Sequence, residues 1–435
     1  MRRWKNSVGR VITALASSQK ECGWIKVSSA PAPAAARLLQ ASRAAQAVKR
    51  RNDGLIEPHG GSLAAGAASE HERDQALQQC TKSIECSDRN ACDVELLSNG
   101  GFSPLSGFMG REEYSSVVHN MQLPDGTLFA LPVVLDTYRN DLHPGDRVRL
   151  DYGGEAIATL DVSDIWTPDK LSEVHNCYGY TTLAHPAVSM VALERGPFYI
   201  GGQVTGLSLP QRIFPCKTPH QLRAELPANT DVVAFQCRNP VHRAHYEIFK
   251  RSLQAENVGK DPICLVHPTC GPTQDEDIPG IVRYHTYEAL QQELDDPQVK
   301  WAYLPYSMHM AGPREAVQHM IIRKNYGCTH FIIGRDMAGC KSRIDGEDFY
   351  GAFDAQEMAK QYAPQLGMEV VPSPNVVYTA ERGYTTDDVV KGEGLTVKKI
   401  SGTKFRQMLR ESQEIPEWFS FDSVIKILKK HYAKH

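Results

Sequence analysis

One ten-residue segment carries side chains that could bind a polyanion: Gln236-Cys-Arg-Asn-Pro-Val-His-Arg-Ala-His245. The guanidinium of Arg238 can donate two parallel hydrogen bonds to phosphate or sulfate oxygens, and imidazoles can donate as well. His242 and His245 are three residues apart, so on a helix they would share one face. Asn239, which a proline follows, is typical of a helix start, where free N–H groups and a positive dipole end attract anions. The segment is therefore predicted to bind phosphate or sulfate.

A second segment of similar chemistry is Gly334-Arg-Asp-Met-Ala-Gly339. Its glycines allow the backbone to approach a ligand closely, and Arg335 can bind an oxyanion with its rigid fork. The segment is not a P-loop, because Cys340 separates Gly339 from Lys341-Ser342. Taken alone, this segment is more typical of a glycine-rich turn with a solvent-exposed Arg-Asp pair. The alternative for the first segment is a capped surface helix. Two such segments on one sheet favour a shared nucleotide site.

The elements that must position both segments alternate between strand and helix. Short apolar runs predict strands at 231–235, 262–266, 299–304 and 330–333, and helical spacing is found at 241–254, 281–294 and 313–325. This alternation predicts a doubly wound parallel sheet of the α/β class. Ligands bind at the carboxyl ends of the strands in such sheets, and both segments directly follow a strand. We expect the two segments to meet there.

The flanking regions have a different pattern. Residues 53–210 contain short apolar runs between glycine and proline turns, for example 131–135 and 147–150, which predicts a mainly β domain. Residues 211–375 form the expected catalytic domain. Residues 376–435, with helical spacing near 401–411 and 421–433, predict a small C-terminal α/β domain.

Residues 1–52 are unlike the rest of the chain. They are rich in Ala and Ser, and eleven Lys or Arg against the single acid Glu21 give them a charge of +10. This composition resembles an organelle transit peptide, and a disordered N-terminus is the alternative. We expect an organelle location, a plastid more than a mitochondrion, or the cytoplasm if the segment is not a transit peptide.

Composition also bears on partners. Since the total charge is -3, residues 53–435 carry -13, which argues against a nucleic-acid partner. No apolar run approaches the roughly 18 residues of a membrane span, so no membrane partner is expected. The eleven cysteines include no C-x-x-C pair and have no histidines at zinc spacing, so we expect structural thiols and no protein-built metal site.

Taken together, these motifs resemble the ATP sulfurylase family. The family patterns Gln-x-Arg-Asn-Pro-x-His-x-x-His and Gly-Arg-Asp-x-Ala-Gly match 236–245 and 334–339, and further similar stretches are 101–109, 311–315 and 322–331. The resemblance covers about residues 53–433. It implies a PUA-like N-terminal domain, a nucleotidyltransferase domain, a homo-oligomer, and Mg²⁺ bound with the ATP phosphates. The implied reaction converts ATP and sulfate to adenosine 5′-phosphosulfate and pyrophosphate, the first step of sulfate assimilation.

The resemblance also implies roles for individual residues. The implied catalytic positions are Cys237, Arg238, Asn239, His242 and His245. ATP contacts are implied for Gln236, Cys237, Arg238, Asn239, Gly334, Arg335, Asp336, Met337 and Val376. Sulfate contacts are implied for Gln236, Arg238 and Ala338. The chain departs from common family residues at Cys237, Met337, His309-Met310 and Ser373-Pro374.

Three other functions share part of this pattern. Class I aminoacyl-tRNA synthetases have an H-x-x-H-like loop but lack the flanking residues of both segments. A bifunctional enzyme that also phosphorylates the product would need a P-loop, which the sequence lacks. A catalytically impaired nucleotide-binding regulator of the same fold would bind ATP without sulfate-dependent turnover.

Overall fold

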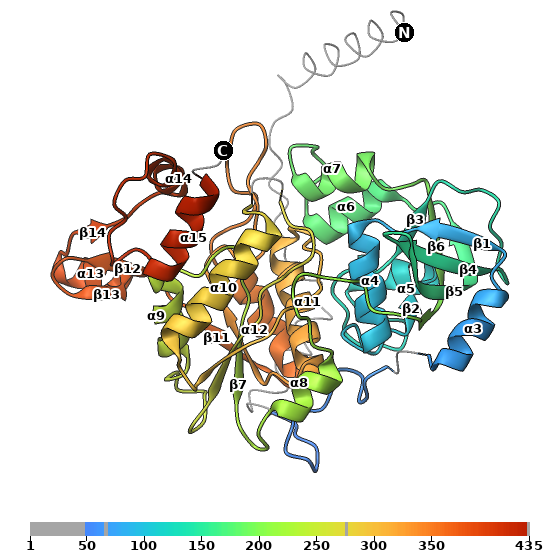
Figure 1. The fold of residues 1–435 in the computed structure, drawn as a ribbon, viewed down its shortest axis with the longest axis horizontal. Coiled ribbons are helices and arrows are strands. Elements are labelled where there is room, and N and C mark those ends of the chain that lie inside the picture. Colours follow the sequence, from blue (N-terminus) through green and yellow to red (C-terminus); the bar gives the residue numbers. More distant parts are fainter. Residues whose placement is uncertain (1–47, 65–67, 275–276, 433–435) are drawn as a thin grey trace, which may run out of the picture. The chain divides into compact units, whose positions relative to one another are not determined.

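A five-stranded parallel sheet lies at the centre of the catalytic part of the chain (Figure 1). The computed structural model describes residues 48–64, 68–274 and 277–432. The sheet has the order β11-β10-β7-β8-β9, with bounds β7 (Val232–Phe235), β8 (Ile263–Val266), β9 (Val299–Trp301), β10 (His330–Ile333) and β11 (Glu369–Pro372). The strands are short apolar runs, and all four residues of β7 and of β10 are buried, as expected for strands covered on both faces. The doubly wound sheet is confirmed.

Helices on the two faces of this sheet bury alternate strand residues in two separate cores. The helices are α9 (Arg243–Ser252), α10 (Gly280–Leu294), α11 (Gly312–Asn325) and α12 (Asp354–Leu366). Val233 and Phe235 pack in the same core as Phe249 of α9. Val232 and Ala234 point the other way and share a core with residues of α11 and α12. The sheet is therefore held from both sides, which makes its carboxyl edge a rigid support.

A second sheet belongs to the N-terminal domain. It has the order β1-β4-β5-β6-β2, with β3 also on β6, and bounds β1 (Lys82–Glu85), β2 (Gly107–Phe108), β3 (Leu135–Thr137), β4 (Arg147–Tyr152), β5 (Glu155–Trp166) and β6 (Phe198–Gly206). The helices of this domain are α3 (Glu70–Gln78), α4 (Asp88–Asn99), α5 (Arg111–Asn120), α6 (Lys170–Tyr178) and α7 (Pro186–Leu193). The predicted strand at 131–135 is wrong except for its last residue. Instead, the backbone N–H groups of Ala130 and Leu131 donate to the side chain of Gln318 in α11.

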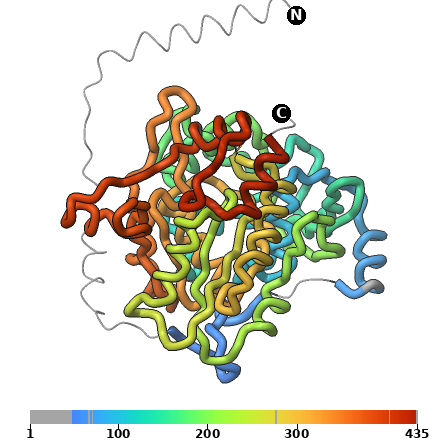
Figure 2. The backbone as a smooth tube through the Cα atoms, turned by 60° about the vertical axis from the view of Figure 1, so that its left-hand side comes forward, coloured from blue at the N-terminus to red at the C-terminus, as the bar shows by residue number. Residues whose placement is uncertain are grey.

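The C-terminal segment forms a small sheet and three helices. Its elements are β12 (Val376–Thr379), β13 (Gly383–Thr386), α13 (Asp387–Glu393), β14 (Val397–Lys398), α14 (Gly402–Arg410) and α15 (Asp422–Tyr432). Helix α15 packs against α10, so the C-terminal segment extends the core on one face of the central sheet. Figure 2 shows this segment, in red, beside the α10 region. The predicted helices near 401–411 and 421–433 are confirmed.

Helix α8 (Pro219–Glu225) lies in the sequence between the N-terminal domain and β7, the first strand of the central sheet. Near the start of the described chain, Arg50 donates to the Thr230 carbonyl and forms an ion pair with Asp231, which ties this part to the edge of β7.

Most of the predicted transit peptide, residues 1–47, lies outside the described residues. Among the described residues no helix is long and apolar enough to span a membrane.

Candidate active site

The two predicted anion-binding segments meet at the switch point of the central sheet, where the order of the strands reverses. The first follows β7 and the second follows β10, and these strands are parallel neighbours, with His330 paired to Val233. In a doubly wound sheet this switch point is where ligands bind, because adjacent connections leave to opposite faces. A pocket of about 680 Å³ opens here, and both Arg238 and Arg335 line it. Other lining residues are Gln274, Asp336, Met337, Gly339, Lys341, Asp348 and Tyr350.

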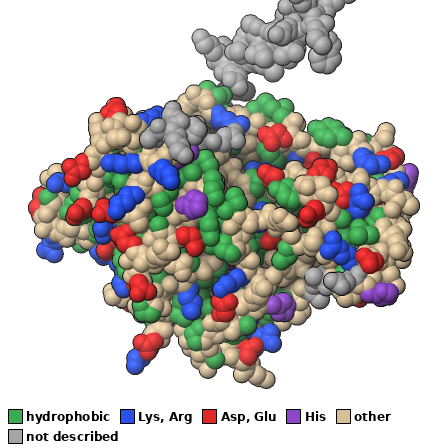
Figure 3. Space-filling model, in the orientation of Figure 1, with side chains coloured by type: hydrophobic (Ala, Val, Ile, Leu, Met, Phe, Trp, Pro, Cys, Tyr) green, Lys and Arg blue, Asp and Glu red, His purple; other side chains and the backbone are tan. Residues whose placement is uncertain are grey.

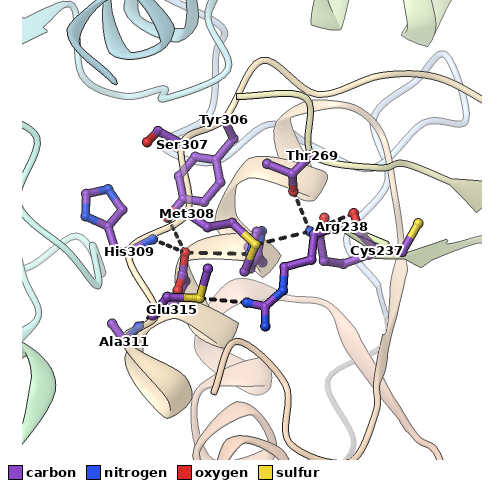
Figure 4. A network of polar contacts seen from close by, with 12 residues as sticks. Cys237, Arg238, Thr269, Tyr306, Ser307, Met308, His309, Ala311 and Glu315 are labelled. Atoms are coloured by element: carbon purple, nitrogen blue, oxygen red, sulfur yellow. Dashed lines mark hydrogen bonds and ion pairs between the residues drawn. The ribbon is translucent and has the colours of Figure 1, made fainter. Parts of the chain in front are cut away.

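Arg238 is half-buried and is held by weak acceptors (Figure 4). One terminal nitrogen donates to the sulfur of Met310 at 2.7 Å, and the other donates to the amide oxygen of Gln274 at 3.3 Å. Its Nε lies 3.4 Å from Asp277 Oδ2. A thioether and a neutral amide are much poorer partners for a guanidinium than a phosphate or sulfate oxygen. Arg238 is therefore oriented before a ligand arrives and can exchange these contacts for an oxyanion.

Gln236 is buried directly beneath Arg238. Its amide nitrogen donates to Thr269 Oγ1 and, at 3.2 Å, to the carbonyl of Cys237. The same nitrogen lies 3.8 Å from the sulfur of Met308, and its oxygen accepts from Arg323. Gln236 is thus locked in one orientation by its neighbours.

The Gly334–Gly339 loop brings a second guanidinium to the pocket. Arg335 and Asp336 are exposed, with Arg335 Nε 3.0 Å from Asp336 Oδ2. Ala338 has a φ of 53°, in the left-handed region that non-glycine residues rarely adopt. Its carbonyl accepts from Gly312, whereas its N–H has no acceptor within the described residues. Such strain is common at ligand sites, and the predicted sulfate contact of Ala338 stays a prediction.

The helix that carries the two histidines starts later than predicted. Asn239 is exposed and is not its N-cap: α9 begins at Arg243, and His242 takes the cap position. The reason is that side chains of α10 hold the preceding loop outside the helix, with the Tyr287 hydroxyl donating to the Asn239 carbonyl at 3.1 Å and Arg283 donating to the Arg238 carbonyl. His245 Nδ1 then accepts from the His242 N–H at 3.1 Å.

The histidine pair is covered by the C-terminal segment. The two imidazoles are stacked with centroids 5.9 Å apart, and the His242 ring also contacts Phe405 and Phe419. His242 Nδ1 lies 2.9 Å from Ser420 Oγ. Burial lowers the pKa of His242 to about 3, with a further contribution from His245, and lowers the pKa of His245 to about 4. Both rings are therefore neutral in the ligand-free protein. They are not among the residues that line the pocket.

Of the predicted site residues, only Arg238, Arg335, Asp336 and Met337 line the pocket, and Cys237 and Val376 are among those that do not. Cys237 is buried with its sulfur 3.9 Å from the Tyr287 hydroxyl, and burial raises the pKa of its thiol to about 12. Its side chain is thus an unreactive core thiol, whereas its carbonyl accepts from Thr269 N–H. Val376 begins β12, where it pairs with Thr386. Its predicted adenine contact stays a prediction.

Several residues that sequence reasoning missed complete the site. Buried Glu315 accepts from the backbone N–H groups of His309 and Ala311 and from the Tyr306 hydroxyl. It thereby fixes the loop that brings Met308 and Met310 against Gln236 and Arg238 (Figure 4). In the sequence the 311–315 stretch resembles the family, but its spacing alone indicates no role for Glu315.

Fold and site define the class of this protein: a nucleotide-binding α/β domain with a pocket for polyanions, joined to a β-rich N-terminal domain. The model of the ATP-sulfurylase family matches residues 215–431, and the model of the PUA-like domain matches residues 56–209. The predicted PUA-like and catalytic domains are thereby confirmed. The chain belongs to the ATP-sulfurylase family.

Individual relatives agree with this assignment. The chain is 42% identical to the sulfate adenylyltransferase of Schizosaccharomyces pombe over 375 residues, which cover 83% of this chain and 75% of that protein. It is 39% identical to the sulfate adenylyltransferase of Saccharomyces cerevisiae over 388 residues, which cover 86% and 75% of the two chains. A similar solved structure is the hexameric APS kinase from Thiobacillus denitrificans, with a TM-score of 0.68 and 26% identity over 86% of this chain and 68% of that one.

Proposed function

We propose that this protein is a sulfate adenylyltransferase, a nucleotidyltransferase that converts ATP and sulfate to adenosine 5′-phosphosulfate and pyrophosphate. The observation that carries the proposal is the pocket at the switch point, where Arg238 and Arg335 come from two loops on adjacent strands. The curated relatives of the same name, at about 40% identity over most of the chain, support it.

The chemical task is to bring two anions together. A sulfate oxygen attacks the α-phosphorus of ATP in line, the bond to the bridging oxygen breaks, and pyrophosphate leaves. Sulfate is already a dianion at neutral pH, so no general base is required. Two unit charges 4 Å apart repel by about 4 kcal/mol at an effective dielectric constant of 20. Guanidinium groups from Arg238 and Arg335 offset repulsion of this size and position both reactants.

The histidine pair suits the leaving group. His245 Nδ1 accepts from the His242 backbone, so its ring proton resides on Nε2, from which it can donate to a phosphate oxygen. Neutral imidazoles add hydrogen bonds to the β- and γ-phosphates as negative charge builds there. Phe405 and Phe419 of the C-terminal segment pack against the His242 ring, and such apolar surroundings strengthen these bonds.

Mg²⁺ is the expected cofactor. The carboxylates that line the pocket are paired with neighbouring cations, Asp336 with Arg335 and Asp348 with Lys341. Because a paired carboxylate is a poor ligand for Mg²⁺, these residues do not fit a protein-built cage. The ion would enter bound to ATP phosphates, where it neutralises part of their charge.

Assembly and location are further parts of the proposal. A homo-oligomer is supported by the hexameric state named for the similar solved structure. A plastid address is supported only by the composition of residues 1–52. Expression of that segment fused to a fluorescent protein, followed by microscopy, tests the address.

The reverse reaction gives a sensitive test of the activity. ATP formation from adenosine 5′-phosphosulfate and pyrophosphate, measured with Mg²⁺ by luciferase, runs in the favourable direction. We expect robust ATP production that is lost on Arg238→Ala and retained on Lys82→Ala, a distant surface control paired with Asp146. Absence of turnover from a folded, ATP-binding protein would instead identify a nucleotide-binding regulator.

A further inference from the structure

Helix α11 carries a stripe of three polar residues that the reaction scheme has not used. Glu315, His319 and Arg323 are spaced four apart, so they lie on one face of the helix. All three are fully buried. The opposite side of α11 is apolar and packs in the core with Ala316, Val317, Met320 and Ile321. Three ionisable side chains in such a position are costly to bury, which points to a role in the adjoining site.

Arg323 is the most unusual member of the stripe. Its terminal nitrogens donate to the ring of His319, to the amide oxygen of Gln236 and, at 3.0 Å, to the His267 carbonyl. Within the part of the chain that the structure describes, no carboxylate lies within ion-pair distance of it. Burial lowers the pKa of Arg323 to about 10, so it stays positively charged at neutral pH. This positive charge is in contact with Gln236, one of the predicted sulfate contacts.

The contact with Gln236 has a consequence for sulfate. A guanidinium has only donors, so only the oxygen end of the Gln236 amide can face it. The NH₂ end must then face the other way. One of its N–H bonds is taken by Thr269, and the other lies between two weaker acceptors, the Cys237 carbonyl at 3.2 Å and the Met308 sulfur at 3.8 Å. This second N–H is the one that sulfate can claim.

We propose that Arg323 is a positioning residue for sulfate, which holds the Gln236 amide with its N–H end towards the anion and its carbonyl oxygen away from it. The reversed amide would present a partial negative charge to a dianion. The positive charge of Arg323 also polarises the amide and strengthens its N–H as a donor. The inference rests on the proposed function, because it assigns Gln236 to sulfate.

Glu315, at the other end of the stripe, supports the loop that contacts Gln236 and Arg238. Glu315 fixes the 306–311 segment through three hydrogen bonds, and this segment places Met308 beside Gln236 and Met310 beside Arg238 (Figure 4). His319, between the two, accepts from Arg323 with Nδ1 and lies 4.0 Å from Glu315 through Nε2. One face of α11 therefore supports two of the three predicted sulfate contacts, Gln236 and Arg238.

The test compares sulfate and ATP kinetics in the full-length enzyme. The wild type is measured first, and absence of sulfate-dependent pyrophosphate release would overturn the proposed function before any variant is considered. In Arg323→Met, the KM for sulfate should rise at least about ten-fold, the loss expected for one charge-assisted hydrogen bond, with the KM for ATP changed less than about two-fold. Arg323→Lys, which keeps a donor, should recover part of the loss.

A double-mutant cycle separates positioning from general packing. If Arg323 acts through Gln236, the pair Arg323→Met and Gln236→Ala should have the same KM for sulfate as Gln236→Ala alone. Arg314→Met is the matched control, because Arg314 is another buried arginine of α11 but binds only backbone carbonyls of the N-terminal domain. It should lower the melting temperature without changing the KM for sulfate.

Two results would overturn the inference. One is an equal rise of both KM values in Arg323→Met, and the other is a multiplicative effect in the double variant. If Arg323→Met does not fold, the same cycle is run with Arg323→Lys. Multiplicative effects of Arg323→Lys and Gln236→Ala on the KM for sulfate would equally overturn the inference.

Discussion

In the ligand-free site Arg238 donates to a sulfur and an amide oxygen, and its ion pair with Asp277 is long at 3.4 Å. The residue is thus preorganised without being saturated. Met310, which supplies the sulfur, is one of the positions where this chain departs from common family residues. The sulfur of Met310 holds the guanidinium in place, and an oxyanion can displace this sulfur easily.

The histidine pair yields a prediction at the same scale. His242→Ala and His245→Ala should each lower kcat about 10–10³-fold, because each removes a donor to the leaving pyrophosphate, with a smaller change in KM. Steady-state kinetics of pyrophosphate release measures both constants. His119→Ala, an exposed histidine of α5, is the control and should match the wild type. A double variant of the pair with full activity would remove both residues from the mechanism.

Individual site residues differed in how far the sequence could predict them. Arg238 and Arg335 could be placed in one pocket because each follows a recognisable apolar strand. Ser420, by contrast, bonds His242 across 178 residues of sequence, and no local pattern indicates such a contact. Arg323 was also missed, since a charged residue on a helix is normally expected to face solvent.

At the scale of elements, the helix α9 shows where local preference is overruled. Asn and Pro at 239–240 are typical of a helix start, yet Tyr287 and Arg283 from α10 bind the carbonyls of 239 and 238 and keep these residues out of the helix. Most strands of the central sheet were predicted well because buried parallel strands are continuous apolar runs, although the predicted strand at 299–304 ends at Trp301. The 131–135 run shows the limit, because it is equally apolar and buried but is bonded by a helix side chain.

This account of α9 predicts that the side chain of Asn239 contributes little to the stability of the protein. A true N-cap lost to alanine would cost about 0.5–2 kcal/mol of stability. Because His242 is the cap and Asn239 is exposed, Asn239→Ala should change the free energy of unfolding by less than about 0.5 kcal/mol. Urea denaturation measures this value. A loss above about 1 kcal/mol would show that Asn239 caps the helix after all.

At the scale of the whole molecule, the charges of the described residues are mixed on the face that Figure 3 shows, where acidic and basic side chains are interspersed. The positive groups of the site are instead gathered in the pocket, where Arg238, Arg335 and Lys341 lie together. Such an arrangement suits a small polyanion.

Buried histidines make the stability of the whole molecule depend on pH. Burial lowers the pKa of His59 and of His185 to about 4, from 6.5 when exposed, and also lowers those of His267 and His319. Between pH 6.5 and 4 the unfolded chain therefore binds protons that the folded chain does not, and stability falls as the pH falls. His59 and His185 each contribute a loss of up to about 1.4 kcal/mol per pH unit.

Burial raises the pKa of Asp93 to about 7 and also raises those of Glu95 and Glu315, which acts in the opposite direction. The histidines are more numerous, because burial also lowers the pKa of His242, His245 and His309. Urea denaturation at pH 7, 6 and 5 should show a steady fall in the free energy of unfolding. Constant or rising stability on acidification would contradict the buried, neutral state of these rings.

The measurement that tests the central claim most directly follows the oxygen atoms. Sulfate labelled with ¹⁸O at all four positions is incubated with ATP, Mg²⁺ and the enzyme, and the products are analysed by mass spectrometry. Attack by sulfate on the α-phosphorus predicts adenosine 5′-phosphosulfate that retains all four labels, unlabelled pyrophosphate, and no product with Arg238→Ala. Loss of one label from the product, or label in pyrophosphate, would contradict the proposed attack.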